Sequence, residues 1–401
     1  MTLSHKGLGR YRQLLSEPGM VGCGVAALAS KLQGSMFTLS LLLTTAPGRS
    51  YAVAGAVAAV SALGGIAAPA RGRLLDRHPY ASVLWSVLAL HAALVALIVV
   101  NEVAHGPLLL TFTGALAANV VAPPVGVLTR VMWRSVTTEE TRSTALALDA
   151  VLADAGFIVG PLLVGVLSAV LVPQVALGTT VLVSALATVL LLRALAGREP
   201  AKSVGKQQSW MGSLTSVPLR LHLGCALFFS AVVGVVEVSL ISYGGELLGS
   251  VSVSVLSAGS IVGGLVIGAL PPVRAAQVSQ LPRLLSYLGL AATALAVAGT
   301  SRPVVVIALT LAVGMAFGPC FVAMYGMTGD LAPIGTAAET QAWVGAALQG
   351  GAALGQAAGA FAFGLWGFGA GVGLAPVFAL MAAGLGVLTD RLRRPVTAQW
   401  H

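Results

Sequence analysis

The stretch "GVAALASKLQGSMFTLSLLLTT", Gly24 to Thr45, is almost wholly apolar and long enough to cross a membrane as one helix, yet it carries Lys31. A spanning α-helix needs about 20 apolar residues. Runs of this length recur through the 401-residue chain, which is 57% hydrophobic and 9% charged and has a mean hydropathy of +0.92. These values lie far outside the range of soluble domains and indicate an all-α integral membrane protein.

Apolar runs predict twelve transmembrane helices. The most polar interior stretch, 197–218, lies between the sixth and seventh runs. We therefore expect two six-helix halves, 1–196 and 219–401, joined by a cytoplasmic linker over 197–218. The expected spans are 20–44, 52–71, 82–101, 107–130, 145–170, 174–194, 219–243, 250–270, 284–299, 303–327, 338–363 and 369–389.

The distribution of basic residues predicts the orientation of these spans. With both termini in the cytoplasm, all but three of the 22 Lys and Arg residues fall on the cytoplasmic side, the exceptions being Lys31, Arg49 and Arg302. This is the asymmetry that the positive-inside rule requires. It also explains the net charge of +9 better than nucleic-acid binding does, because the basic residues are scattered over several short segments. We expect a multi-pass protein of the plasma membrane.

Several classes of function are disfavoured by what the sequence lacks. Cys23, Cys225 and Cys320 lie singly in three different runs, without the spacing of a metal site or a disulfide framework. The chain contains no GxxxxGK[ST] phosphate-binding loop, no His–Glu metal cluster and no nucleophile motif. We therefore expect neither an ATP-driven pump nor an enzyme, and no metal or cofactor. We further expect a monomer that uses a proton gradient as its energy source.

The stretch "RGRLLDRHP", residues 71–79, follows the second run and resembles the loop motif of the major facilitator superfamily. The matching positions are Gly72, Leu74, Asp76 and Arg77. The resemblance implies the fold of that superfamily, in which two halves of six helices rock about a substrate site near the middle of the membrane.

For Asp76 the resemblance implies a role in closing the cytoplasmic side. A carboxylate there caps a neighbouring helix N-terminus and pairs with arginines. Arg130 and Arg134, at the inner end of the fourth run, are the expected partners. The alternative is an ordinary turn aspartate followed by arginines that follow the positive-inside rule.

The fifth run contains "DAGFIVGPLLVG", residues 154–165, which is similar to the glycine–proline signature of the superfamily's exporters. Gly156, Gly160 and Pro161 carry the similarity. It implies a helix that seals the cavity and reshapes when the transporter opens. The fourth run departs from the family pattern, because its only arginine, Arg130, lies at the inner end.

Lys31 requires a partner, because an ionisable side chain near mid-membrane costs about 3 kcal/mol or more. Counting about 1.5 Å per residue places Lys31 and Asp154 at matching depths, whereas Asp149 lies closer to the cytoplasm and on another face of its helix. We therefore expect an ion pair with Asp154 first and with Asp149 second. Snorkelling of the lysine to the inner surface is the alternative.

Further candidates lie in other runs. Glu237, in the outer half of the seventh run, is a candidate for proton or cation binding, and His91 is expected to be a packed neutral histidine. Glu339 begins the eleventh run, where an acid is also favourable for purely structural reasons. Possible residues of a substrate cavity are Gln33, Met36, Asn119, Tyr325, Trp343 and Glu339.

These features predict a proton-coupled secondary transporter that exports small amphipathic or hydrophobic molecules. In it, Asp154, together with Glu237, would exchange protons as the surroundings of these acids change. Two alternatives stay open. One is a proton-coupled transporter of a polar or anionic metabolite, in either direction, with Lys31 as the anion partner. The other is a non-transporting receptor or assembly protein on the same fold. The expected partners are a small-molecule substrate, protons and the lipid bilayer, and no nucleic acid.

Overall fold

The computed structural model describes residues 2–47, 49–196, 212–243, 245–270, 280–298 and 302–392, and within them every regular element is a helix. The first half contains α1 (Thr2–Ser16), α2 (Met20–Thr45), α3 (Tyr51–Leu63), η1 (Gly64–Ala67), α4 (Ala68–Arg77), α5 (Tyr80–Val103), α6 (Leu108–Val120), α7 (Val125–Val136), α8 (Glu139–Val170) and α9 (Pro173–Leu195). The second contains η2 (Gly212–Thr215), α10 (Val217–Tyr243), α11 (Gly245–Ala269), α12 (Leu281–Ala298), α13 (Pro303–Leu331), α14 (Ala337–Trp366) and α15 (Phe368–Leu392).

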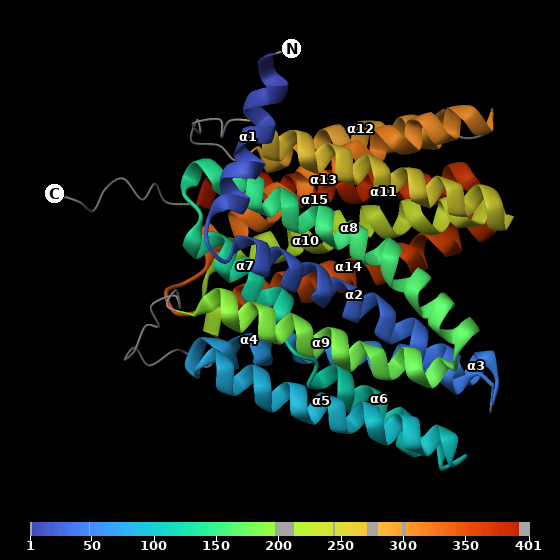
Figure 1. Ribbon diagram of the computed structural model, residues 1–401. Coiled ribbons are helices and arrows are strands. Elements are labelled where there is room, and N and C mark those ends of the chain that lie inside the picture. The colour runs from blue at the N-terminus through green and yellow to red at the C-terminus, as the bar shows by residue number, and fades with distance from the viewer. Residues whose placement is uncertain are drawn as a thin grey trace.

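The long helices lie side by side in one bundle (Figure 1). Among the described residues, eleven helical spans are long and apolar enough to cross a membrane. They correspond to eleven of the twelve predicted spans. The remaining one is α14, which has 30 residues but carries several amides, glycines and an acid in place of large apolar side chains. The prediction of an all-α membrane fold is confirmed.

Each half has its own hydrophobic core. One core is built from α10 to α15 and includes Phe229, Phe317 and Leu288. The second lies mainly among helices of the N-terminal half and includes Trp133 and Met132. Most of the predicted linker, 197–211, lies outside the described residues.

The fourth span is broken, whereas its apolar run predicts one continuous helix. α6 ends at Val120 and α7 begins at Val125, with Pro123 and Pro124 between them. Proline has no backbone N–H and therefore cannot continue the hydrogen-bond ladder of a helix. The break divides the span into an α6 half and an α7 half (Figure 1).

Side chains from neighbouring spans stabilise this break. The Arg71 guanidinium donates to the carbonyl oxygens of Asn119, at 3.0 Å, and Ala122, at 2.5 Å. Nδ1 of His91, which is fully buried, lies 2.8 Å from the carbonyl oxygen of Ala118. Since carbonyls without partners are costly inside a membrane, Arg71 and His91 have a structural role here.

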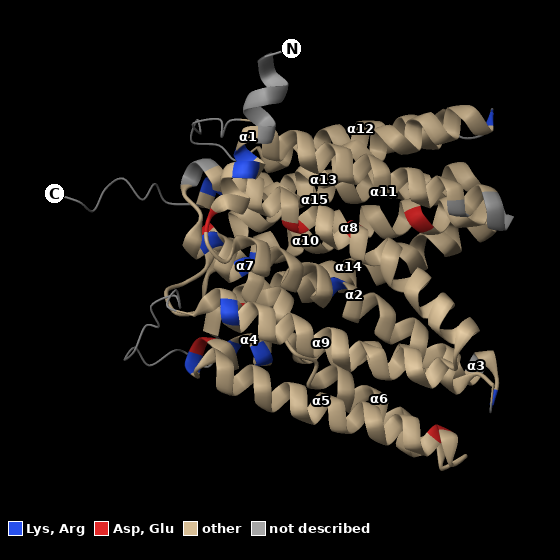
Figure 2. Ribbon diagram, in the orientation of Figure 1, with Lys and Arg blue, Asp and Glu red and all other residues tan. Residues whose placement is uncertain are grey.

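Basic side chains gather at one end of the bundle, which also holds α1 and the end of α15 (Figure 2). We call this end, which contains Arg73, Arg134 and Arg391, the basic end. In the predicted orientation it faces the cytoplasm. Arg49 and Arg302 lie at the opposite end (Figure 2).

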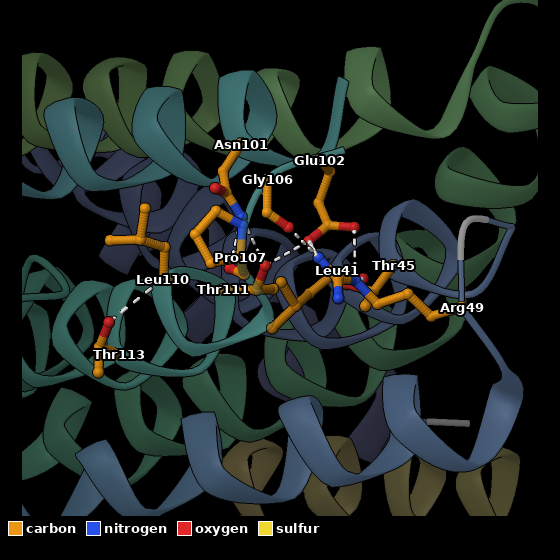
Figure 3. A network of polar contacts seen from close by, with 10 residues as sticks. All are labelled: Leu41, Thr45, Arg49, Asn101, Glu102, Gly106, Pro107, Leu110, Thr111 and Thr113. Carbon is orange, nitrogen blue, oxygen red and sulfur yellow. Dashed lines mark hydrogen bonds and ion pairs between the residues drawn. The ribbon is translucent and has the colours of Figure 1, made fainter. Parts of the chain in front are cut away.

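A polar network stabilises the N-terminal half at that opposite end (Figure 3). Arg49 pairs with Glu102 at 3.4 Å and donates to the carbonyl oxygen of Gly106 at 2.8 Å. Thr111 donates to the same carboxylate, and the Asn101 amide donates to Thr111 at 3.0 Å. The network ties the α2–α3 connection to the ends of α5 and α6 and so makes this rim one unit.

Candidate functional site

An ion pair joins the two halves at the basic end. Arg73 of α4 contacts Glu339 of α14 through two bonds, Nη2 to Oε1 at 2.7 Å and Nε to Oε2 at 3.2 Å. Glu339 is fully buried and also accepts a bond from the backbone N–H of Ser213 at 3.2 Å. Glu339 was expected as a possible cavity residue, and the structure instead places it in this contact between the halves.

Asp76 caps the N-terminus of α14. Its two carboxylate oxygens accept bonds from the backbone N–H groups of Ala338, at 3.0 Å, and Glu339, at 2.9 Å. A helix N-terminus has free N–H groups and a partial positive charge, so a carboxylate is favourable there. Gly72 makes the approach possible, because a Cβ at this position would lie 2.6 Å from the carbonyl oxygen of Ala338.

The arginines expected to pair with Asp76 have other partners. Arg134 of α7 pairs with Asp330 of α13 at 2.6 Å, which is a second ion pair between the halves at the basic end. Arg130 instead contacts Asp149, as described below. Arg77 is exposed at the end of α4. Sequence reasoning missed Arg73 and Asp330, although Arg73 lies inside the loop motif.

The helix α1 adds a further connection at this end. Arg10 donates to the carbonyl oxygen of Leu270 at 2.7 Å, and the Tyr11 hydroxyl donates to that of Leu265 at 3.1 Å. Burial raises the pKa of Tyr11 to about 12, so the phenol keeps its proton at physiological pH. Thr144 of α8 donates to the carbonyl oxygen of Gly268 at 2.7 Å. The end of α11 is thus held by α1 and α8 together.

Three charged groups of the N-terminal half meet inside the bundle. Nε of Arg130 lies 3.0 Å from Oδ2 of Asp149, and Nζ of Lys31 lies 3.9 Å from the same oxygen. The side chains are 10%, 2% and 13% exposed, respectively. The order expected for the partners of Lys31 was therefore wrong, because Asp149 is the acid at ion-pair distance. α8 begins at Glu139, three residues before Arg142, from which the depth was counted, so Asp149 lies deeper in its helix than that count placed it.

The C-terminal half contacts this cluster through one aromatic ring. The guanidinium carbon of Arg130 lies 4.0 Å from the centroid of the Tyr325 ring of α13. A cation over a ring face is attracted by the ring quadrupole, more strongly where both are desolvated. Tyr325 was expected to line the cavity, and the structure places it against the charged cluster.

The other two candidate proton-binding acids, Asp154 and Glu237, lie in different halves. Asp154 of α8 interacts with Ser260 of α11 and with the Lys31 ammonium. Glu237 of α10 interacts with Gln356 of α14 and with Asp154. Both acids are half-buried. Side chains from both halves therefore contribute to the surroundings of these two acids, and neither Ser260 nor Gln356 was anticipated from the sequence.

The glycines of α8 let this helix approach α2 closely. A Cβ at Gly156 would lie 2.6 Å from Cβ of Lys31, and one at Gly160 would collide with the Ser35 hydroxyl. Ser35 donates to the carbonyl oxygen of Gly156 at 2.9 Å. Pro161 follows inside the helix. Small residues in this spacing are typical of close helix packing in membranes.

Two other expected cavity residues, Met36 and Asn119, instead hold helices of the N-terminal half together. Met36 is fully buried in an apolar cluster with Val164 and Ala176, so it packs between helices of one half. The Asn119 amide donates to the carbonyl oxygen of Ser61 at 2.9 Å and braces α6 against α3. Gln33 is buried and Trp343 is half-buried.

Two halves with separate hydrophobic cores, joined by ion pairs at one end and containing buried charged groups, define the architecture of a secondary transporter. The family model "Major Facilitator Superfamily" matches residues 20–356. The chain belongs to this superfamily, whose members transport solutes and are not enzymes. No curated protein matches the chain in sequence.

Solved structures of transporters share this fold. A bacterial homologue of the iron transporter ferroportin, in an outward-facing state, is similar with a TM-score of 0.76 and 16% identity, over 92% of this chain and 99% of that one. The fucose:proton symporter of Escherichia coli has a TM-score of 0.70 and 15% identity, over 94% and 98%. The human organic anion transporter MFSD10 (TETRAN) has a TM-score of 0.69 and 16% identity, over 91% of this chain and 98% of that one.

Proposed function

We propose that this protein is a proton-coupled secondary transporter of the plasma membrane, with Asp154 and Glu237 as its proton-binding groups. The observation that carries the proposal is that these two carboxylates come from opposite halves and act on each other. Two like charges in a poorly hydrated space cannot both be ionised cheaply, so one of them takes up a proton readily. Separation of the halves during alternating access would remove this repulsion and change the proton affinity.

The connections at the basic end supply the second requirement, a gate. Arg73–Glu339, Asp76 with the α14 N-terminus, and Arg134–Asp330 all join one half to the other. Each must break if the halves are to separate there. We propose that they close the cytoplasmic side and that the cycle opens and closes them.

The expected direction, export of small amphipathic molecules, rests on the similarity of the α8 sequence to the glycine–proline signature of the superfamily's exporters, in which Gly156 and Gly160 pack closely against α2. A second candidate, transport of a polar metabolite, is supported by the charged cluster around Asp149. A buried cluster that contains Lys31 and Arg130 is unusual for the binding of purely apolar substrates.

Reconstitution into proteoliposomes tests the proton coupling. A pH gradient imposed across vesicles that contain a solute panel should drive flux, with a matching pH change inside. Asp154→Asn should reduce this proton-driven flux at least tenfold, while exchange of solute without a gradient continues. If Asp154→Asn and Glu237→Gln both leave the gradient-driven flux unchanged, the proton-binding role is wrong.

A further inference from the structure

The charged cluster has more positive charge than Asp149 can neutralise. Lys31 and Arg130 both lie within ion-pair distance of the same carboxylate oxygen, Oδ2 of Asp149. Arg130 is at hydrogen-bond distance, whereas Lys31 is at 3.9 Å and makes no hydrogen bond to any residue that the structure describes. A lysine side chain that is only 13% exposed and whose ammonium makes no hydrogen bond to the described residues is costly inside a membrane.

The break in the fourth span places the N-terminus of α7, which carries a partial positive charge, beside Lys31. A Cβ on Gly126, in the first turn of α7, would lie 3.9 Å from Nζ of Lys31 and 3.1 Å from the Ser30 hydroxyl. In that turn Val125 and Leu128 donate to the carbonyl oxygens of Pro123 and Pro124. Within the described part of the chain, the amides of Gly126 and Val127 have no partner outside the helix, as is usual for a first helical turn.

Asp154 is the remaining charge near the lysine. The groups that face it are Lys31 on α2, Glu237 on α10 and Ser260 on α11. While Asp154 is ionised it helps to neutralise Lys31. When Asp154 is protonated, the cluster of Lys31, Arg130 and Asp149 carries one net positive charge, which a bound anion would neutralise.

We propose that Lys31 and the first turn of α7 bind the carboxylate of an organic monoanion, and that this anion binds together with a proton on Asp154. The inference rests on the proposed function and specifies the substrate class of the same site. Binding one anion with one proton leaves the total charge of the site unchanged, which avoids burying a net charge. A proton and an anion that favour each other's binding move in the same direction, so the site is that of a symporter, which agrees with the second candidate function and not with export driven by proton entry.

A binding experiment on the full chain in lipid nanodiscs tests the anion site without relying on transport. The probes are acetate, benzoate and 1-naphthoate, each compared with its neutral amide. A ligand of the folded state raises the melting temperature with its concentration. At least one carboxylate should stabilise the protein while its amide does not, and Lys31→Gln should weaken that affinity at least tenfold. Lys31→Arg should keep part of it, and Arg302→Gln, at the opposite end, should leave it unchanged.

Proton uptake distinguishes this inference from the proposed function. In weak buffer near neutral pH, the stabilising carboxylate should cause uptake of about one proton per bound anion. Asp154→Asn should abolish the uptake and keep the anion bound. Equal effects of acids and amides, or undiminished binding by a folded Lys31→Gln variant, would overturn the anion site even if proton-driven flux still depends on Asp154. Anion binding with unchanged proton uptake in Asp154→Asn would instead refute the proton role alone.

Discussion

Arg73 and Glu339 are 266 residues apart in the chain and form a two-bond ion pair that joins the two halves. The acid is fully buried, whereas the arginine is 29% exposed. Removing the partner of a buried acid strongly destabilises the conformation that buries it, because the charge then stays out of water without compensation. The pair therefore favours the conformation in which the basic end is closed, and several outcomes can be predicted from it and its neighbours.

Arg73→Ala should open the basic end. A hydrogen-bonded charge pair contributes about 1.5–3 kcal/mol, which corresponds to a tenfold or larger change in an equilibrium. Val151→Cys, on α8 where it faces Gly264 of α11, serves as a reporter. Its maleimide labelling rate should rise about tenfold with Arg73→Ala. Arg77→Ala, in the same motif but exposed, is the matched control, and equal labelling in both variants would contradict the gate.

Gly72→Ala should weaken the same contact by steric means. The added Cβ would meet backbone atoms of Ala338 and Glu339 at 2.6–2.8 Å, and backbone cannot move aside cheaply. At Gly65 the nearest atom is the mobile side-chain oxygen of Gln349, at 3.1 Å. Reporter labelling should therefore rise in Gly72→Ala and stay near the parent rate in Gly65→Ala. The reverse order would show that the α4–α14 approach is not limiting.

Substitution by alanine should have different effects on stability at two glycines of α8, Gly156 and Gly165. Gly156→Ala overpacks the α2 contact and should cost about 1–3 kcal/mol. A Cβ at Gly165 meets nothing within 4 Å, so Gly165→Ala should be neutral or should stabilise by up to about 1 kcal/mol through helix propensity. Melting temperatures in one detergent measure both. A similar loss at the two positions would argue against a specific α2–α8 contact.

A double-mutant cycle should identify the partner of Lys31. Because Asp149 is the acid within ion-pair distance, Lys31→Met and Asp149→Asn should show a coupling energy of about 1–3 kcal/mol. The cycle of Lys31→Met with Asp154→Asn should give a smaller value. Thermal unfolding of the three variants of each cycle provides the energies, and a larger coupling to Asp154 would reverse the assignment made here.

Tyr11→Phe should loosen the basic end modestly. Loss of one hydrogen bond of about 0.5–1.5 kcal/mol predicts a rise of about two- to tenfold in the labelling of Val151→Cys. Since burial raises the pKa of Tyr11 from 10.0 to about 12, the contact contributes fully below about pH 10 and is lost as pH rises through about 12. Its effect should therefore be constant between pH 6 and 9. The exposed Arg12→Ala is the control, and a Tyr11→Phe effect that changes within this range would contradict the assignment.

Local sequence was sufficient for the features that depend on composition and short motifs. Apolar runs identified the spans, and the loop motif around Asp76 identified a carboxylate that caps a helix. The depth count failed for Lys31 because it began at Arg142, whereas α8 begins at Glu139, directly after Thr138, a residue type that is common at helix N-caps. Met36 was misassigned because apolar residues that line a cavity and those that pack between helices have the same sequence signature.

Length and hydropathy are sufficient to identify this chain as a membrane-spanning helical protein of two halves, because they limit what a bilayer can accommodate. Only the tertiary structure decided which charges meet. Arg73 with Glu339, Arg134 with Asp330, and Lys31 with Asp149 join residues whose proximity depends on how whole helices tilt, break and pack. No local pattern encodes such pairings, since each depends on contacts between helices that are distant in the chain.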